Sequence, residues 1–258
     1  MTRDHHHEIE IDASADDVWR AISDGAELTR WYADRATVTP GEGGIVAVGW
    51  EGEDDTVMEG TSRIDVWEPG ARLRLVDLPP EDSAGFPKLE EPTVQEWTIV
   101  TEGGATVLRL VHSGFPETDD WDGIYDSTDH GWDVFLLSLR HYLERHPGQP
   151  RRAIVATAAL DLDPATAWNA LRAACGVTGD RFEAKLPAGE ALSGTVVLER
   201  PGKVLLASVD ELDGGLLFVT LEMGTIWASL AAFGTARTRL DGLGDRWRDW
   251  MINAPSAG

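Results

Sequence analysis

The chain lacks the features that would cross-link it or hold it in a membrane. Its 258 residues include one cysteine, Cys175, which excludes an internal disulfide and is typical of a small buried hydrophobic residue. No apolar run approaches the roughly 20 residues that span a bilayer, and the first residues lack the apolar core of a secretory signal. We therefore expect no membrane span and a cytoplasmic location.

Lysine is also scarce, and acidic residues dominate the charge. Only Lys88, Lys185 and Lys203 are lysines among 22 basic residues, and the formal net charge is −23. Such a chain repels a phosphate backbone, so we expect no nucleic-acid partner. Solubility explains the acidity without a specific cationic partner.

Two distant segments, Ile11–Ile22 and Leu160–Leu171, carry nearly the same pattern. In each, alternating apolar residues precede an Asp, Ser or Pro start signal, and an apolar residue then stands directly before Trp19 or Trp168. Each segment therefore predicts a strand that leads into a helix. Two copies this far apart indicate a duplicated domain.

The first half predicts a strand over 6–12, a helix over 15–23 with Ser14 as N-cap, and a short helix over 26–32. An antiparallel meander of six strands follows, at 36–39, 45–50, 57–67, 73–78, 94–100 and 106–112. The polar segment 114–129 is expected to form a loop. Helical spacing returns over 132–143, with an apolar stripe of Trp132, Phe135, Leu136, Leu139 and Leu143.

The second half repeats this plan in shortened form and lacks an equivalent of 28–32. We expect helices over 164–174 and 235–251, and strands at 154–162, 181–186, 194–199, 204–209, 216–223 and 226–232. Two prolines and a glycine within 147–150 mark a linker. The expected domains are 1–146 and 152–258, joined by 147–151.

Three motifs, in this order of elements, resemble a known superfamily. They are Val18-Trp19-Arg20-Ala21-Ile22, Leu28-Thr29-Arg30-Trp31-Tyr32, and the run 106–115 that leads into Gly131, Trp132 and a long helix. Residues 5–146 resemble the START-like (SRPBCC, Bet v 1-like) superfamily, in particular the branch related to the C-terminal domain of the Hsp90 ATPase activator Aha1 (AHSA1). The resemblance implies an α+β helix-grip fold, in which a curved antiparallel sheet wraps around a long C-terminal helix, here present twice.

The resemblance also implies an apolar small molecule as ligand, because the space under the long helix usually holds one in this superfamily. Strand parity places Trp97 and Ile99 on one face, and Leu108, Leu110 and His112 on one face of the partner strand. Inward-pointing faces of this kind would suit an apolar ligand. The candidate ligand-binding residues are Trp50, Trp67, Trp97, Ile99, Leu108, Leu110, His112, Phe115, Trp121, Tyr125 and Trp132.

Core packing is the competing explanation for the tryptophans. It is favoured for those at apolar-stripe positions of helices, namely Trp19, Trp168 and Trp247. For Trp50, Trp97 and Trp132 both explanations stay open.

No catalytic residue is assigned. His112 could shuttle protons near neutral pH, but a structural hydrogen bond is favoured. Glu59 and Glu96 could act as an acid or base if buried, yet alternation predicts that both face solvent.

Neither a metal nor a cofactor is expected. His5 and His7 would share a strand face while His6 points away, but no acidic partner is evident in sequence, so a frayed terminus is favoured. The acidic run 117–129 lacks the residue order of a calcium loop. It is expected to be a solvated lid over the cavity mouth, with 79–92 as the opposite rim.

Three functions remain in view. The favoured one is binding of an apolar or aromatic molecule in the N-terminal domain, with the second copy as a scaffold or dimerising unit, in a homodimer or an intramolecular pseudo-dimer. A polyketide cyclase or aromatase would use the same cavity through its shape, without a nucleophile and base pair. An Hsp90 co-chaperone or protein-interaction role is disfavoured, because the activator's N-terminal domain and its Trp-His-Trp segment are absent.

Substitution of Trp97 or Trp132 by alanine separates cavity lining from core packing. If these side chains face an open cavity, alanine weakens ligand binding more than stability. If they are core, it lowers the free energy of unfolding by roughly 3–5 kcal/mol. Urea unfolding and ligand titration of the same variants give the two quantities.

Overall fold

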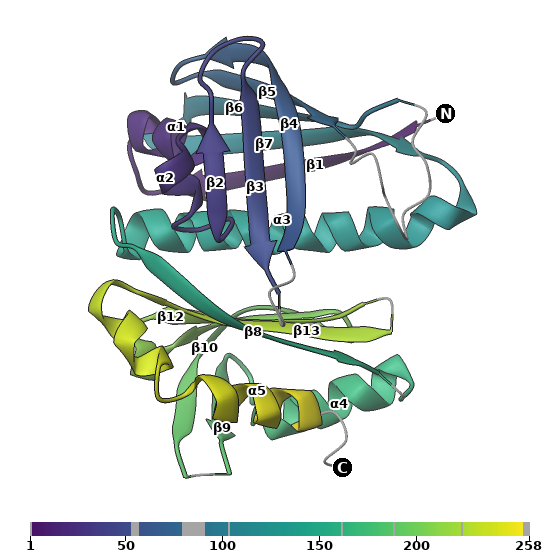
Figure 1. The fold of residues 1–258 in the computed structure, drawn as a ribbon, viewed down its shortest axis with the longest axis vertical. Coiled ribbons are helices and arrows are strands. Elements are labelled where there is room, and N and C mark those ends of the chain that lie inside the picture. The colour runs from purple at the N-terminus through teal and green to yellow at the C-terminus, as the bar shows by residue number, and fades with distance from the viewer. Residues whose placement is uncertain are drawn as a thin grey trace. The chain divides into compact units, whose positions relative to one another are not determined.

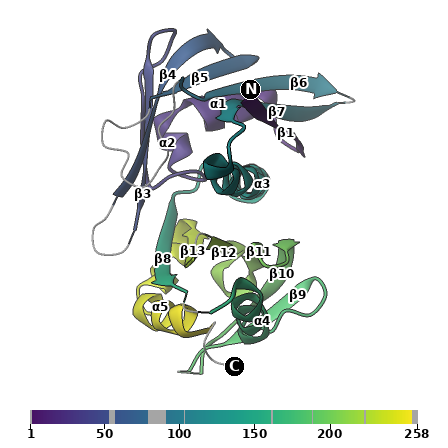
Figure 2. The same cartoon turned by 90° about the vertical axis from the view of Figure 1, so that its right-hand side faces the viewer.

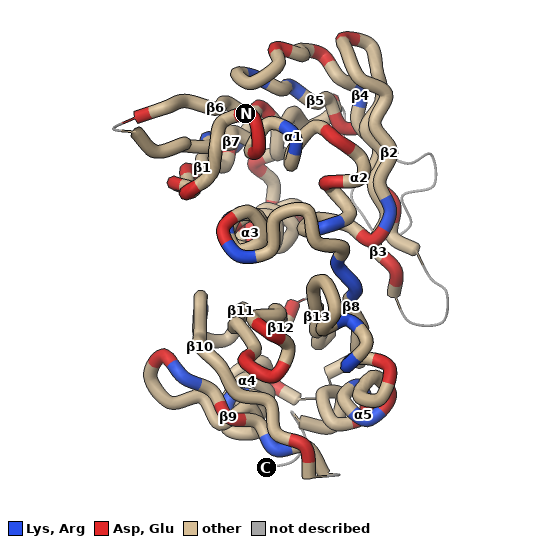
Figure 3. The backbone as a smooth tube through the Cα atoms, turned by 90° about the vertical axis from the view of Figure 1, so that its left-hand side faces the viewer, with Lys and Arg blue, Asp and Glu red and all other residues tan. Residues whose placement is uncertain are grey.

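The computed structural model describes residues 2–52, 57–78, 91–102, 104–160, 162–187, 189–222 and 224–254. The chain divides into two compact units, one made of the residues up to Trp50 with Val57–Gly148, and one made mainly of Gln149–Gly258 (Figure 1). Within the described residues, no helix combines the length and the apolar character needed to cross a bilayer. Acidic positions are distributed along both units (Figure 3).

The first unit contains a seven-stranded sheet in the order β1-β7-β6-β5-β4-β3-β2. The first strand, β1, pairs antiparallel with the last, β7, and the others follow as a meander. The strands are β1 (Thr2–Ile11), β2 (Arg35–Val38), β3 (Ile45–Glu51), β4 (Val57–Glu68), β5 (Arg72–Leu78), β6 (Val94–Glu102) and β7 (Ala105–Pro116).

Three helices accompany this sheet: α1 (Ala15–Ser23), α2 (Gly25–Leu28) and α3 (Asp119–Arg145). The longest, α3, packs against β1 and β7. In Figure 1, β1 and β7 run along α3 while β2 and β3 run across it, and in Figure 2 α3 is seen nearly end on, inside the curve of the sheet. This arrangement confirms the predicted α+β helix-grip fold.

The start of α3 corrects the expectation of a loop over 114–129 and of a solvated lid within it. β7 continues to Pro116, and α3 begins at Asp119. Asp119, Asp120 and Asp122 lie in the first helical turn, where the helix dipole favours negative charge. The other predicted rim, 79–92, falls almost entirely outside the described residues.

The second unit has a six-stranded sheet in the order β8-β13-β12-β11-β10-β9. Here too the first strand pairs with the last and a meander follows, so the unit is a tandem copy with one strand fewer. The strands are β8 (Arg151–Ala159), β9 (Arg181–Lys185), β10 (Ala191–Arg200), β11 (Val204–Val209), β12 (Gly215–Glu222) and β13 (Thr225–Phe233). The first of them starts at the last residue of the predicted linker.

The repeated strand-to-helix pattern has the same physical basis in both units. The Ser14 hydroxyl accepts a hydrogen bond from the Asp17 amide at 3.1 Å ahead of α1, and the Asp163 carboxylate accepts one from the Thr166 amide at 3.0 Å ahead of α4 (Pro164–Ala174). The two tryptophans that follow, and Trp247, are buried as core residues, as predicted. Cys175 is also buried, and burial raises the pKa of its thiol to about 12.

The prediction of a long helix over 235–251 is wrong. The chain instead forms 3-10 turns at η2 (Gly234–Leu240) and a short α5 (Gly244–Asn253). A separate 3-10 turn, η1 (Asp210–Leu212), lies between β11 and β12. Gly242 and Gly244 lie at the interruption, and glycine is among the least favourable residues inside an α-helix. The apolar spacing was real, since Leu240, Trp247 and Met251 are all buried.

Replacing Asp163 by alanine is expected to lower the free energy of unfolding measurably, because the Thr166 amide loses its hydrogen-bond acceptor. Asp163→Ser, which keeps an acceptor oxygen, should retain most of the stability. Chemical denaturation of both variants measures the difference; equal losses would show that the cap contributes nothing.

Candidate functional site

The register of β6 and β7 brings the predicted inward faces together. Trp97 lies opposite Leu110 and Ile99 lies opposite Leu108, and all four side chains are buried. From α3, Trp132 meets Trp97 edge to face, with ring centroids 5.3 Å apart. At 5% and 4% exposure, Trp97 and Trp132 have the burial of core residues.

His112 joins the helix to the sheet through both of its ring nitrogens. The Trp132 indole donates to Nδ1 at 2.9 Å, and Nε2 lies 3.2 Å from a carboxylate oxygen of Asp77. An indole N–H can only donate, so Nδ1 is unprotonated and Nε2 carries the proton toward Asp77. His112 therefore makes structural hydrogen bonds through both ring nitrogens, which is the role that its sequence context favours.

Asp77 of β5 is the acceptor at the centre of this network. Besides His112, its carboxylate accepts hydrogen bonds from Ser62, Thr93 and Gln95 at 2.7–2.9 Å. Burial alone would raise its pKa, but the hydrogen bonds that it accepts from His112, Thr93 and Ser62 outweigh burial and hold the pKa below its usual value. The negative charge of Asp77 is therefore satisfied on several sides.

Sequence reasoning missed Asp77, although a signal was present. In β5 it shares its strand face with Leu73 and Leu75, both of which are buried. A carboxylate at an inward position of an alternating strand requires hydrogen-bond donors around it. The alternation of Leu73, Leu75 and Asp77 in β5 therefore indicated a polar network on the inner face of the sheet.

Tyr32 is a second residue that the prediction omitted. Its ring stacks parallel to Trp132, with centroids 6.2 Å apart, and contacts Phe135 at 4.7 Å and Trp50 at 5.2 Å. Burial, and then the charge of Asp77, raise the pKa of the Tyr32 hydroxyl, which stays protonated at neutral pH. The Trp50 indole donates to the Tyr32 carbonyl at 2.8 Å.

Not all of the predicted residues lie in this cluster. Phe115 contacts His112 at 4.6 Å and Tyr125 at 5.5 Å, which extends the rings along α3. Trp121 is buried on α3. Trp67 contacts Trp19 of α1 at 5.1 Å, so its described ring contact is with the core helix.

The carboxylates of β4 and β6 face outward, as alternation predicts. Glu59 is exposed, and Glu96 is about one-third exposed and accepts a hydrogen bond from Arg72 at 2.7 Å. The ion pair with Arg72 gives Glu96 a surface role.

The prediction of a frayed terminus at His5–His7 is wrong, because these residues belong to strand β1. His5 lies opposite His112 in the β1–β7 register and is buried. Its ring stacks on Tyr125 with centroids 3.8 Å apart. Burial lowers the pKa of His5 even though Asp129 acts in the opposite direction.

The first unit matches one protein family. A model of the family described as "Activator of Hsp90 ATPase homolog 1-like protein" matches residues 12–144. The chain belongs to this family. The AHSA1 match covers most of the first unit, from the strand-to-helix junction before α1 to the end of α3. None of the curated protein sequences matches the chain.

Solved structures similar to this AHSA1 chain include both single and double domains. The Aha1 dimer from Colwellia psychrerythraea is 20% identical, with a TM-score of 0.47 over 57% of this chain and 99% of that one. The di-domain ARO/CYC BexL from the BE-7585A biosynthetic pathway is 16% identical, with a TM-score of 0.47 over 98% and 94%. DynU16, from the dynemicin biosynthetic locus, is 19% identical, with a TM-score of 0.45 over 98% and 96%.

The lowered pKa of Asp77 predicts a pH-dependent contribution to stability. Its ionised form stabilises the fold above the ordinary carboxyl range, and this contribution is lost as the pH falls through the folded-state pKa. The difference in free energy of unfolding between wild type and Asp77→Asn should therefore shrink with acidification. Urea unfolding across acidic pH measures it, with the exposed Asp249→Asn as control. A constant difference would contradict the prediction.

Proposed function

We propose that the first unit, in the domain formed by residues 1–146, binds an apolar or aromatic small molecule beside Tyr32, Trp50 and Phe135. The observation that carries this proposal is the partial exposure of these three rings, which contact one another. Their neighbour Trp132 is buried. Half-buried aromatic faces next to a packed wall offer stacking surface to a flat apolar ligand.

The polar groups near these rings narrow the ligand class. The Tyr32 hydroxyl is kept protonated and can donate to a carbonyl or hydroxyl oxygen, whereas Asp77 is anionic and repels a carboxylate. The net charge of −23 acts in the same direction. We expect a neutral aromatic molecule with an oxygen substituent to bind better than a fatty acid.

Binding is favoured over catalysis by the state of the titratable groups. His112 and Asp77 hydrogen bond to each other, and the remaining His112 nitrogen accepts from Trp132. A general base needs a free lone pair within reach of the substrate. Cyclase-like chemistry at this site would rest on the shape of the binding surface alone.

Native mass spectrometry of the purified chain, followed by calorimetric titration with neutral aromatic polyketides, sterols and fatty acids, tests the proposal. Trp50→Leu should weaken binding about tenfold, since an aromatic contact is worth ~1 kcal/mol or more. Trp227→Leu is the matched control, because Trp227 is also a half-buried strand tryptophan beside a phenylalanine, Phe218, but lies in the second unit.

A clean unliganded mass without saturable binding would refute the proposal, and so would equal losses in the two variants. A new product mass after incubation with a polyketide would identify the enzymatic alternative instead.

A further inference from the structure

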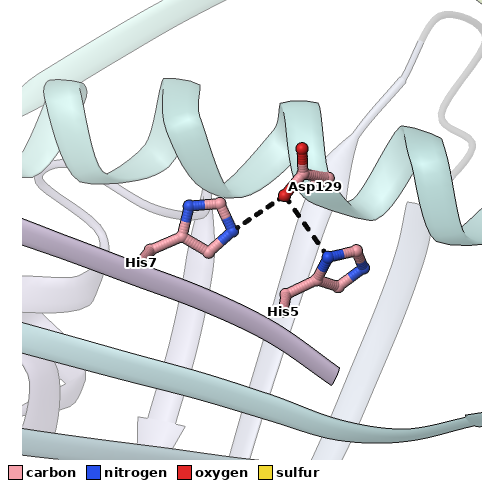
Figure 4. Close-up of side chains that lie close together, drawn as sticks. All are labelled: His5, His7 and Asp129. Atoms are coloured by element: carbon pink, nitrogen blue, oxygen red, sulfur yellow. Dashed lines mark ion pairs between the residues drawn. The ribbon is translucent and has the colours of Figure 1, made fainter. Parts of the chain in front are cut away.

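Two histidines of β1 and a carboxylate of α3 converge at the opposite end of the aromatic series from Trp50. His5 and His7 share one strand face, and Figure 4 shows both rings turned toward Asp129. A single oxygen, Oδ1 of Asp129, lies 3.3 Å from His5 Nδ1 and 3.2 Å from His7 Nε2. One possible ligand atom from each of the three residues lies within 4.8 Å of the other two.

We propose that His5, His7 and Asp129 form a binding site for a divalent transition-metal ion, with Zn²⁺ as the best match. This inference goes beyond the proposed ligand binding and does not depend on it. Ligand atoms about 2.0–2.1 Å from a tetrahedral zinc ion lie roughly 3.3 Å from one another. The two nitrogen-to-oxygen distances agree with that spacing.

An unsatisfied nitrogen provides an independent sign of a missing partner. His7 Nε2, the nitrogen that faces Asp129, is buried and has no hydrogen-bond partner among the residues that the structure describes. The side chains of His5 and His7 are only 2% and 10% exposed. Buried polar atoms are nearly always satisfied in folded proteins. His7 Nε2 is especially informative, because it lies close to Asp129 without the geometry of a hydrogen bond.

The donor set defines the class of ion. Two imidazole nitrogens with one carboxylate oxygen suit zinc and its first-row neighbours, whereas calcium and magnesium prefer oxygen ligands throughout. Three protein ligands leave a coordination position for water or another small ligand.

Surrounding groups would hold the ligands in place. On the other side of the His7 ring, Nδ1 lies 3.6 Å from a carboxylate oxygen of Asp133, one helical turn beyond Asp129. A carboxylate in this position favours a proton on Nδ1 and leaves Nε2 free to bind metal. The stacking of His5 on Tyr125 fixes the second ring.

His130 marks the main competing arrangement. With Asp129 and Asp133 it forms a second group that could hold an ion, and its Nδ1 is buried without a described hydrogen-bond partner. The two arrangements share Asp129 but differ in their histidines, so substitutions on β1 and α3 distinguish them.

Calorimetric titration of the full, untagged chain with ZnCl₂, after removal of metals by chelation, tests the site. We expect one ion per chain, and a loss of affinity of at least ~10-fold in His7→Ala and in Asp129→Asn. His6→Ala is the matched control, because His6 is exposed on the opposite face of the same strand. Circular dichroism of the metal-free variants verifies that each is folded.

Two further measurements test the metal site without relying on the affinity of a single variant. Zn²⁺ should raise the unfolding temperature of wild type and of His6→Ala but not of Asp129→Asn. Bound Co²⁺ should give the visible absorption of a four-coordinate ion. The proposal is overturned if wild type binds no Zn²⁺, if His6→Ala loses as much affinity as His7→Ala, or if only His130→Ala loses it.

Discussion

The contacts of Trp132 hold the long helix of the first unit in the curve of its sheet. Its indole donates to His112, and its ring contacts Trp97, Tyr32 and Phe135. This one residue therefore sets the tautomer of His112, the position of Asp77 relative to the helix, and the placement of the half-buried rings. The buried hydrogen bond between Trp132 and His112 fixes the position of α3 on the sheet as well as stabilising it. A shift of α3 would leave the indole N–H and the His112 Nδ1 without partners.

Much of the fold followed from periodicity, and the failures have identifiable physical causes. Period-two alternation located the strands and the shared face of Trp97 and Ile99, because a half-buried sheet imposes that spacing. The start of α3 was missed because its outward residues are acidic, and charge at a helix N-terminus resembles loop composition. The last helix of the second half was predicted to be too long, because glycines interrupt it although its apolar residues are still buried.

Site residues were harder to predict. Asp129 meets His5 and His7 only through tertiary packing, and nothing local in the sequence announces that contact.

The two copies have kept the same strand order while diverging in the element that covers the sheet. In the first unit a helix of 27 residues carries Trp132 and Asp129, whereas in the second α5 has 10 residues. The core of the second unit combines small residues, including Ala156, Ala207 and Ala228, with the aromatic side chains of Trp168, Phe182 and Trp247.

In each sheet the first strand pairs with the last, and this has a consequence for how the chain is made. Thr2 lies opposite Pro116, and Arg151 lies opposite Phe233, so neither sheet is complete until its last strand has been synthesised. Pairings this distant in sequence are slow to form. During synthesis the edge of β1 therefore waits unpaired through more than a hundred residues of growth. The exposed acidic residues of β1, Asp4, Glu8 and Glu10, disfavour pairing of that edge with another chain.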